Sequence, residues 1–224
     1  MNKHVIIVAG GKGSRMKTDL PKQFLIVEDR PILMHTIEAF YNYDANIQII
    51  VILPADQIVY WQEQIAKYDF HIRHKTAIGG STRYDSVKNG LSQVADGLVA
   101  VHDGARPLVD WLTIEDAFQS AAKYGSGIAS VKLKDSIRLV INNHENQSVD
   151  RESYCLIQTP QVFQYDIIRK AYENSSSNIG FTDDASVVEH LGIPVHLTAG
   201  SYENIKITSP EDLIIAEAIL KARA

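Results

Sequence analysis

Apolar runs and segments of helical periodicity alternate along the first hundred residues of the chain. Strands are expected at 3–9, 47–53, 70–77 and 98–102, three of them continuous apolar runs typical of strands covered on both faces. Helical patterns separate these runs, at 31–43, 56–68 and 82–94. Such alternation indicates an α/β fold with a mainly parallel sheet and helices on both faces. Ligands of such sheets bind beyond the carboxyl ends of the strands.

The pattern changes after Tyr124. Short strands without intervening helices are expected at 127–133, 136–141, 147–149 and 154–158. The resulting antiparallel insertion, at about 132–157, either elaborates the monomer locally or forms a β-arm that joins two copies, and the pattern leaves both interpretations open. Helices at 164–174 and 183–191, a short strand at 195–197 and a closing helix at 209–222 complete a single domain spanning residues 1–224.

Composition narrows the class of protein. The chain has 224 residues, of which 45% are hydrophobic, enough for one sizeable core. A net charge of -5 argues against a general nucleic-acid binder, because phosphates would have to be met by a local group of basic residues. The apolar runs are far shorter than the ~20 residues that cross a bilayer, and the single cysteine, Cys155, excludes an internal disulfide framework. We expect a cytoplasmic protein.

The segment GGKGSRMKTDLPKQF, at 10–24, directly follows the first expected strand. Its glycines let the backbone pass close to a ligand, and successive peptide N–H groups can bind phosphate oxygens. Four basic residues lie within eleven positions of this otherwise acidic chain: Lys12, Arg15, Lys17 and Lys22. The segment is therefore a candidate phosphate loop, although a solvated surface turn has the same pattern.

A second glycine pair opens GGSTRYDSVKNGL, at 79–91, and enters a helix that carries Arg83 and Ser86 in its first turns. Backbone groups at this place can meet a base edge or a ribose. Ordinary capping of the helix by Ser81 or Thr82 is the alternative interpretation.

VHDGARP, at 101–107, ends the buried strand with a carboxylate, Asp103. A carboxylate at this edge can hold a divalent cation on nucleotide phosphates, since hard oxygen ligands suit Mg²⁺. A simple ion pair between Asp103 and Arg106 is the alternative. His102 has no second histidine at metal-ligand spacing, which favours a hydrogen-bonded sheet residue.

Four motifs follow downstream: VDRESY, QTPQVF, FTDDAS and ENIKIT. Lys206 stands in the short apolar run NIKIT, where a lysine is unexpected unless its ammonium has a partner. It is a candidate phosphate contact. Asp183 and Asp184 are interpreted as acids at a helix N-terminus.

Taken together and in order, GGKGSRM with PKQF, GGSTRYDSVKNGL, VHDGARP, VDR, TPQVF, TDDAS and NIKITSPEDL resemble the 2-C-methyl-D-erythritol 4-phosphate cytidylyltransferase family. The resemblance extends over nearly the whole chain. It implies a Rossmann-like nucleotidyltransferase body, with CTP and Mg²⁺ as co-reactants and a polyol phosphate as acceptor. It also implies a homodimer whose β-arms cover one another's sites, with neither nucleic acid nor membrane as a partner.

The resemblance also implies roles for individual residues. The catalytic residues would be Arg15, Lys22 and Lys206. The nucleotide would be bound by Ala9, Gly10, Gly11, Gly13, Gly80, Ser81, Arg83, Ser86 and Asp103, with Asp103 also on the metal. The methylerythritol phosphate would be bound by Arg106, Asp135, Ser136, Arg151, Thr159 and Thr182, with Arg151 offered by the partner subunit.

Two departures and two rival functions complete the comparison with that family. Gly104 replaces a more usual alanine, and Ser136 replaces a threonine while keeping its hydroxyl. A ribitol-5-phosphate cytidylyltransferase is the nearest rival, but that sister family tends to have a serine and a bulkier residue where this chain has Gly104 and Ala105. A non-catalytic nucleotide-binding module is the rival of another class, and the complete set of charged residues at 15, 22, 103 and 206 argues against it.

Overall fold

A seven-stranded sheet forms the centre of the protein, and the computed structural model describes residues 1–10 and 20–223 of it. The strand order is β11-β7-β10-β6-β1-β4-β5. Their bounds are β1 Lys3–Val8, β4 Gln48–Leu53, β5 Lys75–Ile78, β6 Leu98–Asp103, β7 Ser126–Lys132, β10 Cys155–Gln164 and β11 Leu197–Ala199. Only β10 runs antiparallel to its neighbours, so the expected mainly parallel sheet is confirmed.

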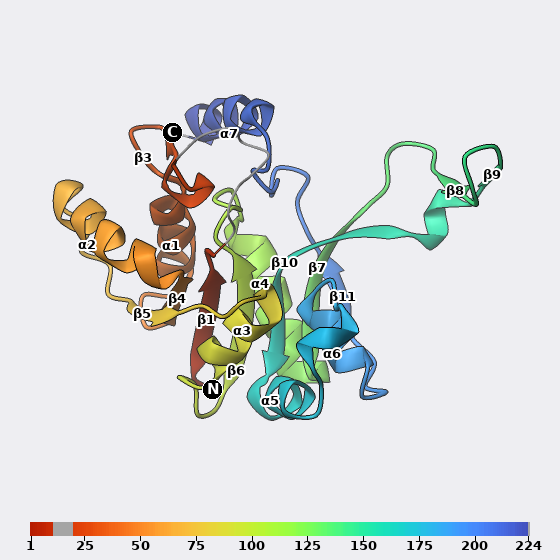
Figure 1. Cartoon of the computed structure of the whole chain (residues 1–224), viewed down its shortest axis with the longest axis horizontal. Coiled ribbons are helices and arrows are strands. Elements are labelled where there is room, and N and C mark those ends of the chain that lie inside the picture. The colour runs from red at the N-terminus through yellow and green to blue at the C-terminus, as the bar shows by residue number, and fades with distance from the viewer. Residues whose placement is uncertain (11–19, 224) are drawn as a thin grey trace.

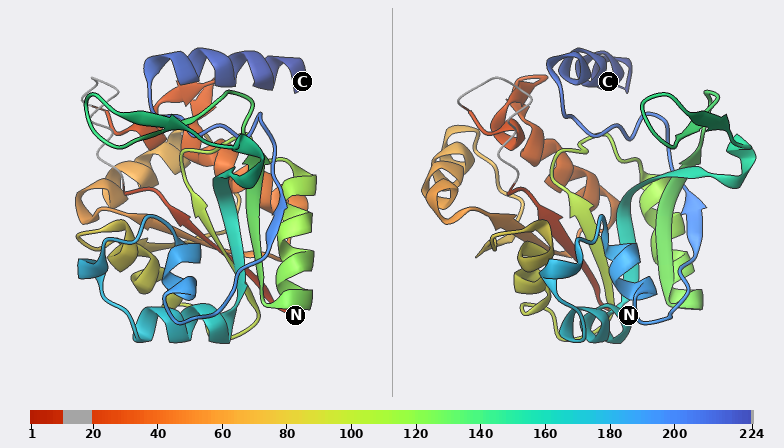
Figure 2. Two further views of the ribbon diagram at one scale, coloured as in Figure 1. Left: turned by 90° about the vertical axis from the view of Figure 1, so that its right-hand side faces the viewer. Right: turned by 45° about the vertical axis from the view of Figure 1, so that its right-hand side comes forward.

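Helices cover both faces of this sheet (Figures 1 and 2). They are α1 Ile32–Tyr43, α2 Ile58–Lys67, α3 Arg83–Leu91, α4 Trp111–Tyr124, α5 Tyr165–Glu173, α6 Asp184–Glu189 and α7 Pro210–Arg223. Alternate side chains of β1 separate two cores: Val5 and Ile7 pack with α1, α2 and α4, whereas Ile6 packs with α3, α5 and α6. This period of two explains why the strand sequence is apolar throughout.

Shorter elements connect these parts. They are the 3-10 helices η2 Lys22–Phe24, η3 Ala55–Gln57, η4 Arg151–Ser153 and η5 Ser177–Ile179, and the strands β2 Ile26–Val27, β3 Arg30–Pro31, β8 Arg138–Val140 and β9 Asn146–Ser148. A third apolar cluster joins α7 to the start of α1 through Ile32, Leu108 and Ile207. It fixes the segment that carries Lys206 above the carboxyl end of the sheet.

Local sequence signals account for several helix ends. Thr82 and Asp85 form a reciprocal capping box at the start of α3. Asp110 accepts a hydrogen bond from the backbone N–H of Thr113 at the start of α4. Gly125 ends α4 with a φ of 94°, a left-handed conformation that glycine adopts without a side-chain penalty.

Several expectations differ from the structure, and three of the differences are large. The strand expected at 70–77 is only Lys75–Ile78, because Phe70 turns into the core beside Trp61 instead of extending along β4. The strand expected at 154–158 is the first half of β10, which pairs with β7 of the main sheet, and β10 continues to Gln164 between β6 and β7, where Val162 and Phe163 are completely buried. No element was expected at 111–124, where α4 packs on β7 and β10.

The insertion forms an arm that projects from the body (Figures 1 and 2). At its end β8 and β9 pair antiparallel in a sheet of two strands. Three consecutive apolar residues on this arm, Leu139, Val140 and Ile141, are 55%, 71% and 53% exposed. These three side chains are therefore largely uncovered by the described part of their own chain.

Within residues 1–10 and 20–223, none of the helices has both the length and the apolar character needed to cross a membrane.

Candidate active site

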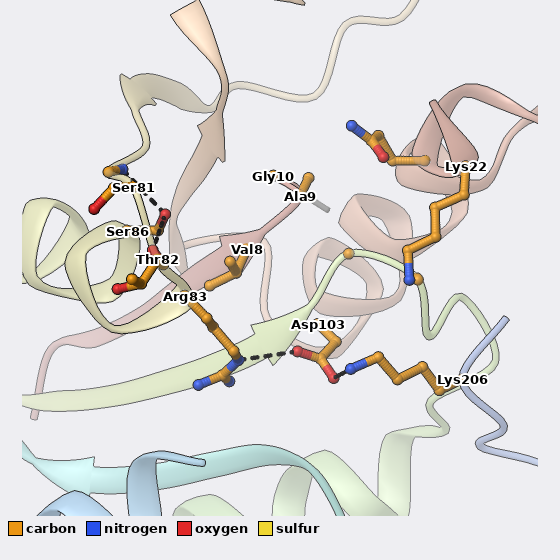
Figure 3. A pocket seen from close by; sticks show the side chains of 14 residues that line it. Val8, Ala9, Gly10, Lys22, Ser81, Thr82, Arg83, Ser86, Asp103 and Lys206 are labelled. Atoms are coloured by element: carbon orange, nitrogen blue, oxygen red, sulfur yellow. Dashed lines mark hydrogen bonds and ion pairs between the residues drawn. The ribbon is translucent and has the colours of Figure 1, made fainter. Parts of the chain in front are cut away.

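A cavity of about 200 Å³ opens at the carboxyl ends of β1 and β6 (Figure 3). Ala9 and Gly10 line it after β1, residues 80–83 and Ser86 line it at the start of α3, and Asp103 lines it at the end of β6. Lys22 and Lys206 line it from two further segments. The position agrees with the rule for ligand sites of parallel sheets.

Asp103 is surrounded by three cations. Lys206 Nζ lies 2.7 Å from its Oδ2, Arg83 Nε lies 3.4 Å from its Oδ1, and Arg106 Nε lies 3.8 Å from Oδ2. Burial by itself would raise the pKa of the carboxyl, but the three cations outweigh it and hold that pKa far below its usual range. The site therefore presents a permanently ionised carboxylate within an excess of positive charge, which suits a ligand that carries several negative charges.

Arg83 reaches Asp103 from a fixed position. Its Nη1 and Nη2 donate to the two carboxylate oxygens of Asp184, at 3.0 and 2.8 Å. Burial opposes the charge on Arg83, but the carboxylates of Asp184 and Asp103 more than offset it and raise its pKa. The guanidinium thus remains charged beside the cavity.

A hydrogen-bond chain holds the backbone at Asp103. The Asp103 N–H donates to Thr159 Oγ1, at 3.1 Å, and Thr159 Oγ1 lies 3.1 Å from Nδ1 of His102. His102 Nε2 lies 3.1 Å from the carbonyl oxygen of Arg106, so the partners assign the proton to Nε2. Burial lowers the pKa of His102 to about 4, which keeps the ring neutral. His102 is a hydrogen-bonded sheet residue, as expected.

The turn before α3 brings bare backbone to the cavity. The Gly80 N–H donates to Ser86 Oγ, at 3.1 Å, and that hydroxyl donates to the carbonyl oxygen of Thr82. A Cβ at Gly80 would stand 2.2 Å from Cβ of Asp85, so only glycine fits here. The capping interpretation of Thr82 is correct as well, so the same turn both starts the helix and lines the cavity.

Gly104 adjoins this cavity closely. A Cβ there would stand 3.0 Å from Cβ of Ala9 and 3.2 Å from the carbonyl oxygen of Val8. An alanine at this position would require these neighbours to shift by a few tenths of an ångström.

Lys22 and Lys206 approach the carboxyl end of β6 from different segments (Figure 3). Lys22 Nζ donates to the carbonyl oxygen of Ile207, at 3.5 Å. The Ile207 N–H in turn donates to the carbonyl oxygen of Ala105, which ties the Lys206 segment to the turn after β6. Lys206, the lysine of the apolar run NIKIT, has the expected partner for its ammonium: the carboxylate of Asp103.

Nine of the expected site residues line this one cavity: Ala9, Gly10, Lys22, Gly80, Ser81, Arg83, Ser86, Asp103 and Lys206. Arg106 stands beside it, with Nη1 on the carbonyl oxygen of Asn204 at 2.7 Å, and Thr159 lies buried behind Asp103. Thr182 is exposed just before α6. Arg15, Gly11 and Gly13 lie outside the described residues, as do Lys12 and Lys17.

The arm residues stand apart from the cavity of their own chain. Asp135, Ser136 and Arg151 are exposed and do not line it. Arg151 Nη1 donates to the carbonyl oxygen of Lys134, at 2.6 Å, and its Nε lies 3.4 Å from Glu152. The guanidinium is thus held within the arm.

Sequence reasoning missed two features of this site. Asp183 caps α6 as expected, but Asp184 is completely buried and binds Arg83. Its doubled aspartate motif gave no sign of that difference. Gln23 lines the cavity beside Lys22, and its buried Oε1 has no hydrogen-bond partner among residues 1–10 and 20–223. No sequence signal marked it.

The fold and this cavity define a nucleotide-binding α/β enzyme. The sequence pattern of the 2-C-methyl-D-erythritol 4-phosphate cytidylyltransferase family matches residues 3–222, and the chain belongs to that family. It is therefore a cytidylyltransferase, an enzyme of the nucleotidyltransferase class.

Individual relatives agree with this membership. The 2-C-methyl-D-erythritol 4-phosphate cytidylyltransferase of Bacteroides thetaiotaomicron is 48% identical over 221 residues, covering 98% of this chain and 100% of the relative. That of Azobacteroides pseudotrichonymphae is 52% identical over 220 residues, covering 97% and 98%.

Solved structures agree as well. The cytidylyltransferase of Thermus thermophilus superposes with a TM-score of 0.80 at 31% identity, covering 99% of this chain and 100% of the other. The 4-diphosphocytidyl-2C-methyl-D-erythritol synthase of Anaerococcus prevotii superposes with a TM-score of 0.83 at 26% identity, covering 98% of both chains. The expected Rossmann-like nucleotidyltransferase fold is confirmed.

Proposed function

We propose that this cavity transfers the cytidylyl group of CTP to 2-C-methyl-D-erythritol 4-phosphate. The products are 4-diphosphocytidyl-2-C-methyl-D-erythritol and pyrophosphate, a step of isoprenoid precursor biosynthesis by the non-mevalonate route. Family membership supports this reaction and does not favour a ribitol-5-phosphate enzyme or a non-catalytic module. The observation that carries the proposal is the convergence of Lys22, Arg83 and Lys206 around an ionised Asp103 at the carboxyl edge of the sheet.

The chemistry needs no protein nucleophile. A phosphate oxygen of the acceptor, already an anion at neutral pH, attacks the α-phosphorus of CTP. The bond from that phosphorus to the bridging oxygen of the β-phosphate breaks, and pyrophosphate leaves with the electron pair. The protein has to hold two anions in line and neutralise the charge that gathers on the α-phosphoryl oxygens. Lys22 and Lys206 line the cavity with the cations for this task, and Arg15 is proposed to add a third.

Mg²⁺ is the proposed cofactor, and Asp103 is the residue that would hold it. Among the described residues no group of three His, Cys, Asp or Glu side chains could bind a metal by itself. One ionised carboxylate still fits, because Mg²⁺ in nucleotide sites takes one or two carboxylates and completes its shell with phosphate oxygens and waters. When bound, the ion supplies positive charge to the triphosphate. Asp103 would hold the ion, and Lys206, now 2.7 Å from Oδ2 of Asp103, would be available to the α-phosphate.

The nucleoside end of CTP is proposed to lie against the turn before α3. Gly80 leaves the backbone uncovered there, and Ser81 and the Ser86 hydroxyl, which line the cavity beside it, are proposed to contact the base. Ala9 and Gly10 present further backbone from the opposite wall.

A homodimer with shared sites is proposed for the arm. The exposed apolar residues Leu139, Val140 and Ile141 need cover, and a second copy related by twofold symmetry would supply it. The same contact would bring Asp135, Ser136 and Arg151 of one subunit to the acceptor end of the other subunit's cavity. Arg106, Thr159 and Thr182 are proposed to serve the acceptor from within the chain, and a cytoplasmic location remains a prediction.

One assay tests the reaction. Purified protein is incubated with CTP, Mg²⁺ and either 2-C-methyl-D-erythritol 4-phosphate or ribitol 5-phosphate, and pyrophosphate release is followed. We expect release with the first acceptor and at most a trace with the second. Preference for ribitol 5-phosphate would assign the chain to the rival substrate, and no release with either acceptor would leave only nucleotide binding.

A further inference from the structure

A completely buried carboxylate stands behind the cavity wall. Asp184, in the first turn of α6, accepts Nη1 and Nη2 of Arg83 at 3.0 and 2.8 Å. Its Oδ1 also accepts the hydroxyl hydrogen of Tyr172, at 2.7 Å. Asp184 does not line the cavity, so any effect on the reaction must pass through Arg83.

Resting on the proposed function, we propose that Asp184 is a positioning residue that holds the Arg83 fork away from Asp103. With Nη1 and Nη2 turned to Asp184, Arg83 contacts Asp103 through its Nε, at 3.4 Å (Figure 3). Asp103 Oδ2 thereby stays available to Lys206, at 2.7 Å, and to the metal that CTP brings.

The preference of guanidinium for carboxylate supports this role. An arginine fork pairs best with one carboxylate through two parallel hydrogen bonds. Without the charge of Asp184, Asp103 would be the nearest carboxylate for that fork. A bidentate Arg83–Asp103 pair would occupy both oxygens and compete with Lys206 and the metal.

The charge balance points the same way. Two carboxylates, Asp103 and Asp184, face three cations, Arg83, Arg106 and Lys206, which leaves one net positive charge for the phosphates. Without the charge of Asp184, Asp103 would be the one carboxylate of this group that faces all three cations. Tyr172 completes the arrangement, since burial and the neighbouring Asp184 raise its pKa well above the usual value and keep its hydroxyl a donor.

A role in helix capping does not explain Asp184. Asp183 already accepts the Ser186 N–H at 3.0 Å, and its own N–H donates the reciprocal bond of the capping box to Ser186 Oγ, at 3.4 Å. Asp184 is therefore not needed to start α6. Its buried side chain could still serve stability, so the experiment must separate folding from positioning.

The test compares Asp184→Asn and Tyr172→Phe with the matched control Tyr84→Phe. The Tyr84 hydroxyl is also buried, but it bonds to the carbonyl oxygens of Tyr172 and Ser175 and not to Asp184. We expect Asp184→Asn to raise the Mg²⁺ concentration for half-maximal activity, and to lower kcat/KM, by about 10- to 100-fold, as for residues that orient a metal ligand. Tyr172→Phe should shift both in the same direction by less, and Tyr84→Phe should shift neither.

A second measurement does not depend on turnover. Isothermal titration calorimetry gives the affinity for CTP with and without Mg²⁺. In Asp184→Asn, most of the gain in CTP affinity that Mg²⁺ provides should be lost. In an Arg83→Gln background the same substitution should change that gain by less than about twofold, because linked residues are not additive. If Asp184→Asn does not fold, Tyr172→Phe carries the same comparison against Tyr84→Phe.

Two outcomes overturn the inference. One is an unchanged Mg²⁺ requirement in folded Asp184→Asn and Tyr172→Phe proteins, and the other is a full effect of Asp184→Asn in the Arg83→Gln background. Failure of the proposed function differs from both, because wild-type protein would then release no pyrophosphate while calorimetry would still report on the Mg²⁺-linked affinity for CTP.

Discussion

Lys206 Nζ lies 2.7 Å from Oδ2 of Asp103, the shortest of the three cation contacts to that carboxylate. The two residues come from segments about a hundred positions apart and meet at the mouth of the cavity. The lysine side chain is 39% exposed, whereas that of Asp103 is 12% exposed, so the ammonium is the partner that can move toward a ligand.

Replacing Lys206 should therefore separate turnover from metal binding. We expect Lys206→Met to lower kcat by about 10²- to 10³-fold, as for loss of one donor to a developing oxyanion. The Mg²⁺ concentration for half-maximal activity should fall, because Asp103 loses a competitor. Lys221→Met is the control, since Lys221 pairs with Glu28 and Glu217 on the surface. A higher Mg²⁺ requirement in Lys206→Met would contradict the competition.

Replacing Lys22 should affect turnover without unfolding the protein. Lys22→Ala removes an ammonium that lines the cavity but no residue of the cores, so the melting temperature should change little. We expect kcat to fall by about 10²- to 10³-fold. Lys88→Ala, an exposed position on α3, is the matched control. Wild-type kcat in a folded Lys22→Ala protein would remove Lys22 from the reaction.

Acid should destabilise the protein through His102. Its pKa is lowered to about 4 by burial, from the ordinary 6.5, so between these values the unfolded chain binds a proton that the folded chain does not. This contribution is constant above pH 6.5 and is lost as the pH falls toward 4. From pH 7.5 to 5.5 it should lower the free energy of unfolding by about 1 kcal/mol.

Urea unfolding at the two pH values measures this loss in the free energy of unfolding. In His102→Gln the loss between pH 7.5 and 5.5 should be smaller by about 1 kcal/mol. Burial also lowers the pKa of His4 and His74, so the wild-type protein should lose more in total. If wild type and His102→Gln lose the same free energy of unfolding between the two pH values, the acid sensitivity belongs to His4 and His74 instead of His102.

The central sheet was predictable because its strands are local signals. β1, β4 and β6 are continuous apolar runs, and each lies within one residue of the expected bounds at both ends. β10 was harder, since its first half pairs with β7 alone, next to the arm, and its second half lies between β6 and β7. Only long-range pairing, which a single segment does not encode, decides where such a strand goes.

The positions of individual site residues were predictable from the sequence, but the contacts between them were not. Gly80 precedes α3, Asp103 ends β6 and Lys206 lies in the segment before α7, and sequence motifs mark all three places. The partner of Arg83 could not be foreseen, because Asp184 lies 101 positions away and looks like an ordinary acid of a helix start. Burial alone distinguishes Asp184 from Asp183, and burial depends on how α6 packs against α5.

Arg151 should serve the active site of the neighbouring subunit. It lies on the projecting arm and does not line its own chain's cavity, and the arm exposes Leu139, Val140 and Ile141. We expect Arg151→Ala to raise KM for the acceptor while KM for CTP changes little, because only the acceptor phosphate loses a cation. Arg138→Ala, on the same arm but bonded to Asn146, is the control.

Subunit exchange gives the sharper measurement of that sharing. In a heterodimer of Arg151→Ala with Lys22→Ala, one cavity would hold Lys22 of one chain and Arg151 of the other, both wild type. An equal mixture measured below the acceptor KM should regain about a quarter of the wild-type rate, since half the dimers would contain one intact site of two. The two variants alone should stay nearly inactive under the same conditions. If exchange is proven by mass-labelled subunits and the rate does not recover, Arg151 acts within its own chain or outside the reaction.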